Sequence, residues 1–251
     1  MAKRISLSLC LLTSVIFAGF PTQAAITTAP TAFPTQVVDQ QGIAEISPQI
    51  AAEQPSSAQA TLTLQDLPPG FTELPPQITA EIASRFDSIR QELGQGNLKP
   101  ENFFAFVNQQ NFQIVLGFTG NIPNQPEQVN FDTSVEQLRQ PEVQQRMMSL
   151  LQEKLKNFGG IKVTQYQGLP ELNNLANVST GVTLGLEMQG QPLRLDFAAF
   201  RRNSVGAFTA VMYPNNGKQP AVELGDVARK LDGQIVKLSA DTNHSPLARV
   251  R

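Results

Sequence analysis

Apolar residues recur at helical spacing in three separate stretches of the chain. The first stretch, 77–93, predicts a helix with one apolar face: Ile78, Ile82, Phe86, Ile89 and Leu93. A turn-rich stretch at 120–129 leads to a second helix, whose core face is Val143, Met147, Leu150, Leu151 and Leu155. The third helix is predicted at 222–238 by the stripe Leu224, Val227, Leu231, Ile235 and Leu238.

An alternating pattern between the first two helices predicts a β-hairpin. Its arms are 103–107 and 112–119, joined by the polar residues 108–111. In the second arm every other residue is large and apolar: Phe112, Ile114, Leu116 and Phe118. Such alternation is typical of a strand with one face buried, so the second arm is expected to be half-buried.

Four further strands are predicted between the second and third helices. A short strand at 161–167 precedes a long one at 178–188, which turns at Gly190-Gln191 into a partner at 193–199. Asn203-Ser204 then turns into a last strand at 205–213. Because helices and hairpin-linked strands are segregated along the chain, the fold class is α+β: an antiparallel sheet flanked by helices, an αβα sandwich. One domain is expected, covering 62–240.

The first residues have the features of a secretory signal peptide. Lys3 and Arg4 precede an apolar run at 5–20, and small residues precede a cleavage site after Ala24. The expected mature protein is exported and soluble, with 1–24 removed. Attachment of a lipid to Cys10 is the alternative, but Leu9 and the position of Cys10 within the apolar run argue against it.

Both flanks of the predicted domain lack an apolar period. Residues 25–61 are rich in Pro, Thr, Gln and Ala, a composition that cannot offset the entropy of ordering, so this leader is expected to be disordered. Residues 241–251 are expected to form a flexible tail. Outside the signal the chain has no cysteine, and its one histidine, His244, lies in this tail.

Composition excludes several classes of function. With a formal net charge of −2 the chain has no basic field that would attract nucleic acid. Outside the signal the chain has no cysteine and no histidine besides His244 in the tail, so Ser-His and Cys-His catalysis and the usual zinc sites are excluded and no enzyme, cofactor or metal is predicted. Carboxylates alone can run glycoside hydrolysis or bind calcium, but the scattered acids lack a spacing that marks a pair: Asp132, Glu136, Glu171 and Glu187.

One predicted hairpin carries a group of charged residues. Arg194 and Asp196 point to the same side of their strand, where an ordinary surface ion pair is expected. The alternative interpretation makes Arg194, Arg201 and Arg202 a patch that contacts an anion or a partner. On the neighbouring strand, Gly181 and Gly185 share one face, where a packed helix of the same domain is expected to approach closely.

Four short motifs resemble a pattern in exported bacterial domains of the broad PsbP-like and LpqN-like group. The motifs are Leu67-Pro68-Pro69-Gly70-Phe71, Phe200-Arg201-Arg202-Asn203-Ser204-Val205, Met212-Tyr213-Pro214 and Asp226-Val227-Ala228-Arg229-Lys230-Leu231-Asp232-Gly233-Gln234-Ile235. The resemblance covers most of 62–240. It implies an antiparallel sheet flanked by helices and a non-enzymatic role outside the cytoplasm, for some members beside photosynthetic complexes in the thylakoid lumen. None of the group's metal-binding positions can be matched here.

The expected function is therefore an exported, non-catalytic accessory or binding domain with a protein partner, in the periplasm or thylakoid lumen. It would be soluble or peripheral to a membrane complex. Two alternatives stay open: a carboxylate-dependent hydrolase, and a carrier of a small apolar ligand held between the helices and the Phe-rich hairpin.

Overall fold

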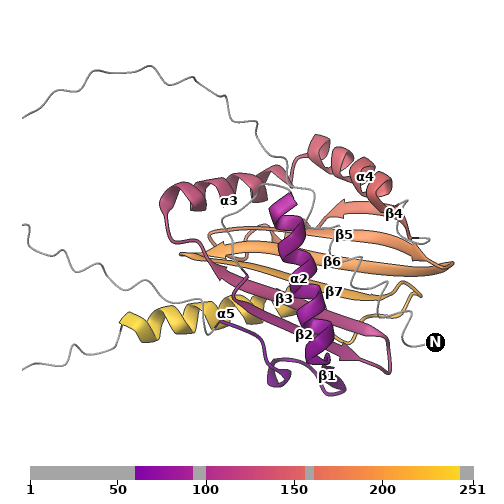
Figure 1. The fold of residues 1–251 in the computed structure, drawn as a ribbon, viewed down its shortest axis with the longest axis horizontal. Coiled ribbons are helices and arrows are strands. Elements are labelled where there is room, and N and C mark those ends of the chain that lie inside the picture. The colour runs from indigo at the N-terminus through magenta and orange to yellow at the C-terminus, as the bar shows by residue number, and fades with distance from the viewer. Residues whose placement is uncertain (1–59, 93–99, 156–160, 244–251) are drawn as a thin grey trace, which may run out of the picture.

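Seven antiparallel strands form a single sheet in the order β1-β2-β3-β7-β6-β5-β4 (Figure 1). The computed structural model describes residues 60–92, 100–155 and 161–243. The strands are β1 (Phe71–Glu73), β2 (Asn102–Asn108), β3 (Gln113–Asn121), β4 (Ile161–Gly168), β5 (Val178–Met188), β6 (Gln191–Arg202) and β7 (Val205–Pro214). The predicted hairpin is β2–β3, and the predicted run of strands after it is β4 to β7.

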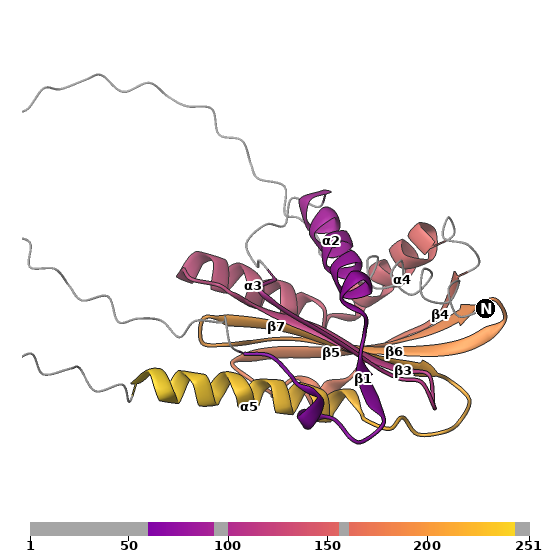
Figure 2. The same cartoon turned by 60° about the horizontal axis from the view of Figure 1, so that its bottom comes forward.

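Helices cover both faces of the sheet. Figure 2 shows α2 (Pro76–Glu92), α3 (Gln125–Gln137) and α4 (Pro141–Leu155) on one face and α5 (Leu224–Asn243) on the other. Two short 3-10 helices, η3 (Leu64–Asp66) and η4 (Pro170–Leu172), complete the described elements. The predicted α+β sandwich, an antiparallel sheet flanked by helices, is confirmed.

The alternation of side chains along the strands supplies a core to each face. On the α4 face, Leu184 of β5 and Leu195 of β6 pack in one cluster with Leu151. On the α5 face, Phe200 of β6 packs in another cluster with Leu231. The helical stripe predicted for 222–238 is the buried face of α5, since Val227, Leu231 and Ile235 are each at most 1% exposed.

The second arm of the hairpin is not half-buried, contrary to the prediction. Between Ile114 and Phe118 every residue of β3 is buried, and so are the polar Gln113 and Thr119 that frame them. The reason lies in the chain before β1, which covers the α5 face: the hydroxyl of Thr119 donates to the carbonyl oxygen of Ala60 at 2.7 Å. Gln113 is satisfied on the same face by the chain before α5.

The domain boundaries differ slightly from the predicted 62–240. Ala60 is 1% exposed and packs in the same cluster as Leu231. At the other end α5 continues to Asn243, so three residues assigned to the flexible tail are helical. The predicted signal at 1–24, most of the leader at 25–61 and His244 lie outside the described residues.

One helix was missed by the sequence pattern. The turn-rich stretch predicted at 120–129 contains the end of β3 and the start of α3, because the side chain of Asn124 caps α3 by accepting from the Glu127 amide at 3.0 Å. Only Val135 is buried along α3. A single buried side chain leaves no helical period in the sequence.

The close approach expected at Gly181 is confirmed, although its source is not an α-helix. A Cβ atom on Gly181 would lie 2.6 Å from Leu172 Cδ1, which belongs to η4. A Cβ atom on Gly185 would instead meet Thr164 and Gln165 of β4, next to an irregularity in the pairing of β4 with β5. Both glycines therefore serve packing within the domain.

Candidate functional site

The three arginines proposed as one contact patch lie in three different places. Arg194 is near the start of β6, whereas Arg201 and Arg202 are its last two residues. Since neighbouring residues of a strand point to opposite faces, Arg201 faces α3 and Arg202 faces α5. The patch predicted from the sequence is therefore not assembled as a single surface.

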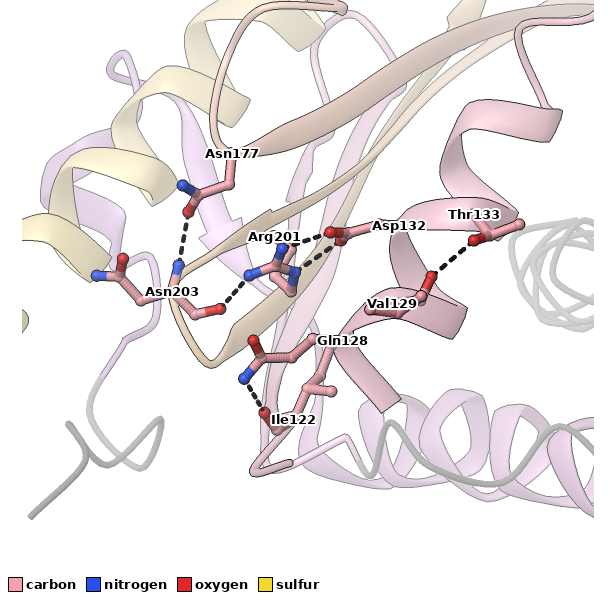
Figure 3. Close-up of polar contacts among 8 residues, drawn as sticks. All are labelled: Ile122, Gln128, Val129, Asp132, Thr133, Asn177, Arg201 and Asn203. Atoms are coloured by element: carbon pink, nitrogen blue, oxygen red, sulfur yellow. Dashed lines mark hydrogen bonds and ion pairs between the residues drawn. The ribbon is translucent and has the colours of Figure 1, made fainter. Parts of the chain in front are cut away.

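Arg201 joins α3 to the sheet and to the β6–β7 turn (Figure 3). Its Nε donates to Asp132 Oδ1 at 2.7 Å and its Nη2 to Oδ2 at 2.5 Å, while Nη1 donates to the carbonyl oxygen of Asn203 at 2.6 Å. Asn203, in a left-handed backbone conformation with φ of 55°, donates its amide to Asn177 Oδ1. The Arg201 side chain is only 13% exposed and is engaged in this network of hydrogen bonds within the domain.

Arg202 performs the same task on the other face. Its Nε and Nη2 donate to the two carboxylate oxygens of Asp232 on α5, at 2.8 and 2.6 Å. Nη2 also donates to the carbonyl oxygen of Leu175. The hydrogen bond with Asp232 is the largest cause of a raised pKa for Arg202. Arg202 therefore fastens α5 to the end of β6.

Arg194 belongs to a polar cluster that the sequence analysis mistook for a surface ion pair. Its Nε donates to Asp196 Oδ1 at 2.8 Å, but Asp196 is buried, with 6% of its surface exposed. The hydroxyl of Thr183 donates to the same oxygen, and the hydroxyl of Tyr213 donates to Oδ2 at 2.9 Å. Burial is the largest cause of a raised pKa for Tyr213.

This cluster orients the guanidinium group of Arg194. The guanidinium carbon of Arg194 lies 6.0 Å from the centre of the Tyr213 ring, and 40% of the Arg194 side chain is exposed. Asp196 accepts hydrogen bonds from the side chains of Thr183, Arg194 and Tyr213. The arrangement holds Arg194 in place and gives Asp196 no open position toward a substrate.

The scattered acids noted in the sequence are not gathered into a site. Asp132 pairs with Arg201, and Glu136 lies on the same helix, whereas Glu171 is in η4 and Glu187 is on β5. In 60–92, 100–155 and 161–243 no three His, Cys, Asp or Glu residues are grouped so that they could hold a metal ion. None of the helices in these ranges is long and apolar enough to cross a membrane.

Sequence reasoning missed the most unusual exposed side chain. Phe112 was assigned to the inner face of a strand, but β3 begins one residue later and Phe112 is 69% exposed. Its φ of 56° is in the left-handed region, where a bulky side chain is rarely found. The observed turn, 109–112, is as long as the predicted 108–111 but lies one residue later, and no signal in the sequence marks this shift.

The turn that carries Phe112 is fixed by side-chain hydrogen bonds. Asn108 Oδ1 accepts from the Gln110 amide at 3.0 Å, and Asn111 Oδ1 accepts from the Gln113 amide at 3.2 Å. The Gln113 side chain donates to the carbonyl oxygen of Val222 at 2.6 Å and accepts from the Ala221 amide at 2.8 Å. Gln113 thus links the turn at 109–112 to the loop at 215–221, and the two segments are together called here the tip surface.

Comparisons with known proteins give no family. No family model matches the chain, and no curated protein matches it. Among solved structures, one match is the Saccharomyces cerevisiae Ran-binding protein Mog1p, at 13% sequence identity and a TM-score of 0.28. The match covers 68% of this chain and 85% of Mog1p. A likeness at that TM-score carries neither a shared fold nor a shared partner to this chain.

Proposed function

We propose that this protein is an exported, non-catalytic accessory domain that acts by binding another protein. Its compartment is the periplasm or the thylakoid lumen, where it is soluble or peripheral to a membrane-associated, photosynthetic complex. The export signal at 1–24 and the resemblance to the PsbP-like and LpqN-like group support the compartment and the accessory role. The binding role is supported by how the described surface uses its side chains.

The observation that carries the proposal is Phe112. An aromatic ring that is 69% exposed, on a backbone with φ of 56°, has neither burial nor favourable geometry to account for it. Strained backbone of this kind costs of order 1–3 kcal/mol and concentrates where it serves function. Aromatic side chains are also the usual anchors of protein–protein interfaces. Binding of a protein partner gives the exposed ring a purpose.

The environments of the carboxylates favour a binding function over a carboxylate-dependent hydrolase. General acid–base chemistry needs a carboxyl group that can reach a substrate in a cleft. Asp196 is the most buried carboxylate among the described residues, and it accepts hydrogen bonds from Thr183, Arg194 and Tyr213. The acids at Asp132 and Asp232 are each held by an arginine.

In the carrier hypothesis an apolar ligand lies between the helices and the Phe-rich hairpin. The phenylalanine rings of this region instead contact one another. Phe118 stacks on Phe103 with ring centres 5.4 Å apart and on Phe208 at 4.9 Å, and Phe131 of α3 meets Phe208 edge-on at 6.0 Å. Such aromatic pairs stabilise the packing between the hairpin and α3. These contacts favour a structural role for the Phe-rich region over ligand storage.

The test follows the full chain, tagged at its C-terminus, in its native host. We expect an N-terminus at Ala25 or a neighbour, recovery of the chain outside the cytoplasm, and one protein that co-purifies in a fixed ratio under gentle conditions. A chain that keeps Met1 in the membrane pellet would contradict export. A chain recovered alone, with hydrolase activity on glycosides, would contradict the binding role.

A further inference from the structure

We infer that the tip surface is where the partner docks, and that the partner presents an uncharged face with an apolar pocket for the ring of Phe112. The inference rests on the proposed binding function and deepens it, because it names the contact surface and the chemistry of the partner. Three observations carry it: the conformation of Phe112, the hydrogen bonds at the base of its turn and the low number of charged side chains around it.

The conformation of Phe112 is the first observation. Asparagine or glycine adopts a positive φ at low cost, whereas a residue with a large side chain is an outlier there. At the β6–β7 turn the chain places Asn203 at φ of 55°, and the β5–β6 turn has Gln189 at φ of 53° followed by Gly190 at φ of 77°. The β2–β3 turn keeps a phenylalanine at φ of 56° and leaves it 69% exposed. The ring is therefore presented to the outside at a cost to the backbone.

The base of the turn is the second observation. Gln113 is 1% exposed and connects the turn to Ala221 and Val222 by three hydrogen bonds. On the other side, Asn108 pairs with Phe71 of β1, and its amide nitrogen lies 3.0 Å from a Cβ atom built on Gly70. Three loops thus meet at the base of the turn that carries Phe112. A turn backbone held in this way loses little conformational entropy on binding, which favours affinity.

Charge is the third observation. Residues 109–113 contain no charged side chain, and residues 214–222 contain one, Lys218. Besides Phe112 and Lys218, the exposed members of the two loops are amides, a glycine and an alanine: Gln109, Gln110, Asn215, Asn216, Gly217, Gln219 and Ala221. Interface cores are depleted of charged residues and enriched in aromatic ones. A partner face of matching, uncharged chemistry follows, with contacts that salt barely screens.

Other exposed apolar side chains lack this combination and serve as controls. Val129 is 56% exposed and Val236 is 45% exposed, but both lie within regular helices, α3 and α5. Asp132 and Arg201 lie close to Val129, so its surroundings are charged (Figure 3). Single exposed apolar residues of this kind are ordinary on protein surfaces.

The experiment replaces Phe112, Val129 or Val236, one at a time, with the photo-crosslinking residue p-benzoylphenylalanine in the full chain expressed in its native host. We expect illumination to yield one heavier adduct from position 112 and none from positions 129 and 236. Its yield should change less than about twofold between about 0.05 and 0.5 M NaCl, because the interface is uncharged. Thermal midpoints equal to that of the unsubstituted chain verify folding.

Each other outcome overturns the inference in its own way. An adduct only from position 129 or 236 leaves the binding function standing and moves its surface elsewhere. An adduct of twice the mass of the chain makes the occupant a second copy. A yield that collapses in high salt makes the partner face charged. If no position gives an adduct while a protein co-purifies, the inference alone fails; if no protein co-purifies either, the proposed function fails with it.

Discussion

The two ends of β6 use side chains in opposite ways. At the β6–β7 turn, Arg201 and Arg202 each donate two hydrogen bonds to one carboxylate, and together they tie a helix to each face of the sheet. At the other end, the tip surface has one charged residue and an exposed ring at Phe112. The difference indicates that the β6–β7 end, called here the paired end, holds the domain together, whereas the tip surface is free to bind.

The largest effect is expected in the core that the paired end fastens. Leu231 on α5 is fully buried, so Leu231→Ala should lower the free energy of unfolding by about 2–5 kcal/mol through lost burial and a cavity. Urea titration followed by circular dichroism measures it. The control is Val236→Ala on the exposed side of the same helix, which should change stability by less than about 0.5 kcal/mol. Equal losses would show that α5 is not docked as described.

A smaller loss is expected when one partner of the Arg202 pair is removed. The side chains of Arg202 and Asp232 are 26% and 12% exposed, so Asp232→Ala should cost about 1–3 kcal/mol, less than for a fully buried pair. The matched control on α5 is Asp226→Ala, whose pair with Arg229 is 55–60% exposed. That control should cost less than about 0.5 kcal/mol. If both variants lose the same amount, the paired end does not hold α5.

Two tyrosines report on buried positions of the sheet at high pH, Tyr166 on β4 and Tyr213 on β7. Burial raises the pKa of Tyr166 from 10.0 to about 12 and also raises that of Tyr213. The neutral phenols favour the folded state, so their contribution is complete below pH 10 and is lost for Tyr166 between pH 10 and 12. Since the chain has two tyrosines and no tryptophan, absorbance at the tyrosinate band reads them directly.

The expected titration shows little tyrosinate in the folded protein at pH 10, where an unfolded control is half ionised. Tyr166→Phe should flatten the loss of stability between pH 10 and 12. Half-ionisation of the folded protein at pH 10 would mean that neither tyrosine hydroxyl is buried as described.

The smallest effect on stability is expected at Phe112, and its sign is opposite. Asparagine tolerates the left-handed conformation, so Phe112→Asn should leave the free energy of unfolding unchanged or raise it by up to about 1 kcal/mol. Thermal and urea unfolding measure it. A loss above about 1 kcal/mol would show that the ring packs on the domain and is not displayed for a partner.

The sequence predicted the elements whose side chains repeat with a clear period. The limits of β5, the partner strands β6 and β7, and the buried stripe of α5 follow from alternating or helical apolar positions. The helix α3 was missed because it has few apolar residues and Val135 is its one fully buried residue. β3 was judged half-buried because the polar Gln113 and Thr119 conceal a second buried face. A periodic sequence pattern predicts burial only where the buried residues are apolar.

The candidate site could not be predicted for a related reason. Arg194, Arg201 and Arg202 share a hairpin in the sequence, but their partners Asp132 and Asp232 are 69 and 30 residues away and become neighbours only in the fold. The sequence assigned Phe112 to a strand because it fits the alternation of Ile114 and Leu116. A turn that lies one residue later in the chain places Phe112 outside the strand, where its ring is exposed.

The division of labour between the two ends is tested most directly by measuring partner capture and thermal midpoint on the same two variants, Phe112→Asn and Asp232→Ala. We expect Phe112→Asn to lose at least about tenfold in capture with no fall in midpoint. Asp232→Ala should lower the midpoint and, assayed below it, capture the partner as well as the unchanged chain. Full capture by Phe112→Asn, or a loss of capture by folded Asp232→Ala alone, would contradict the account.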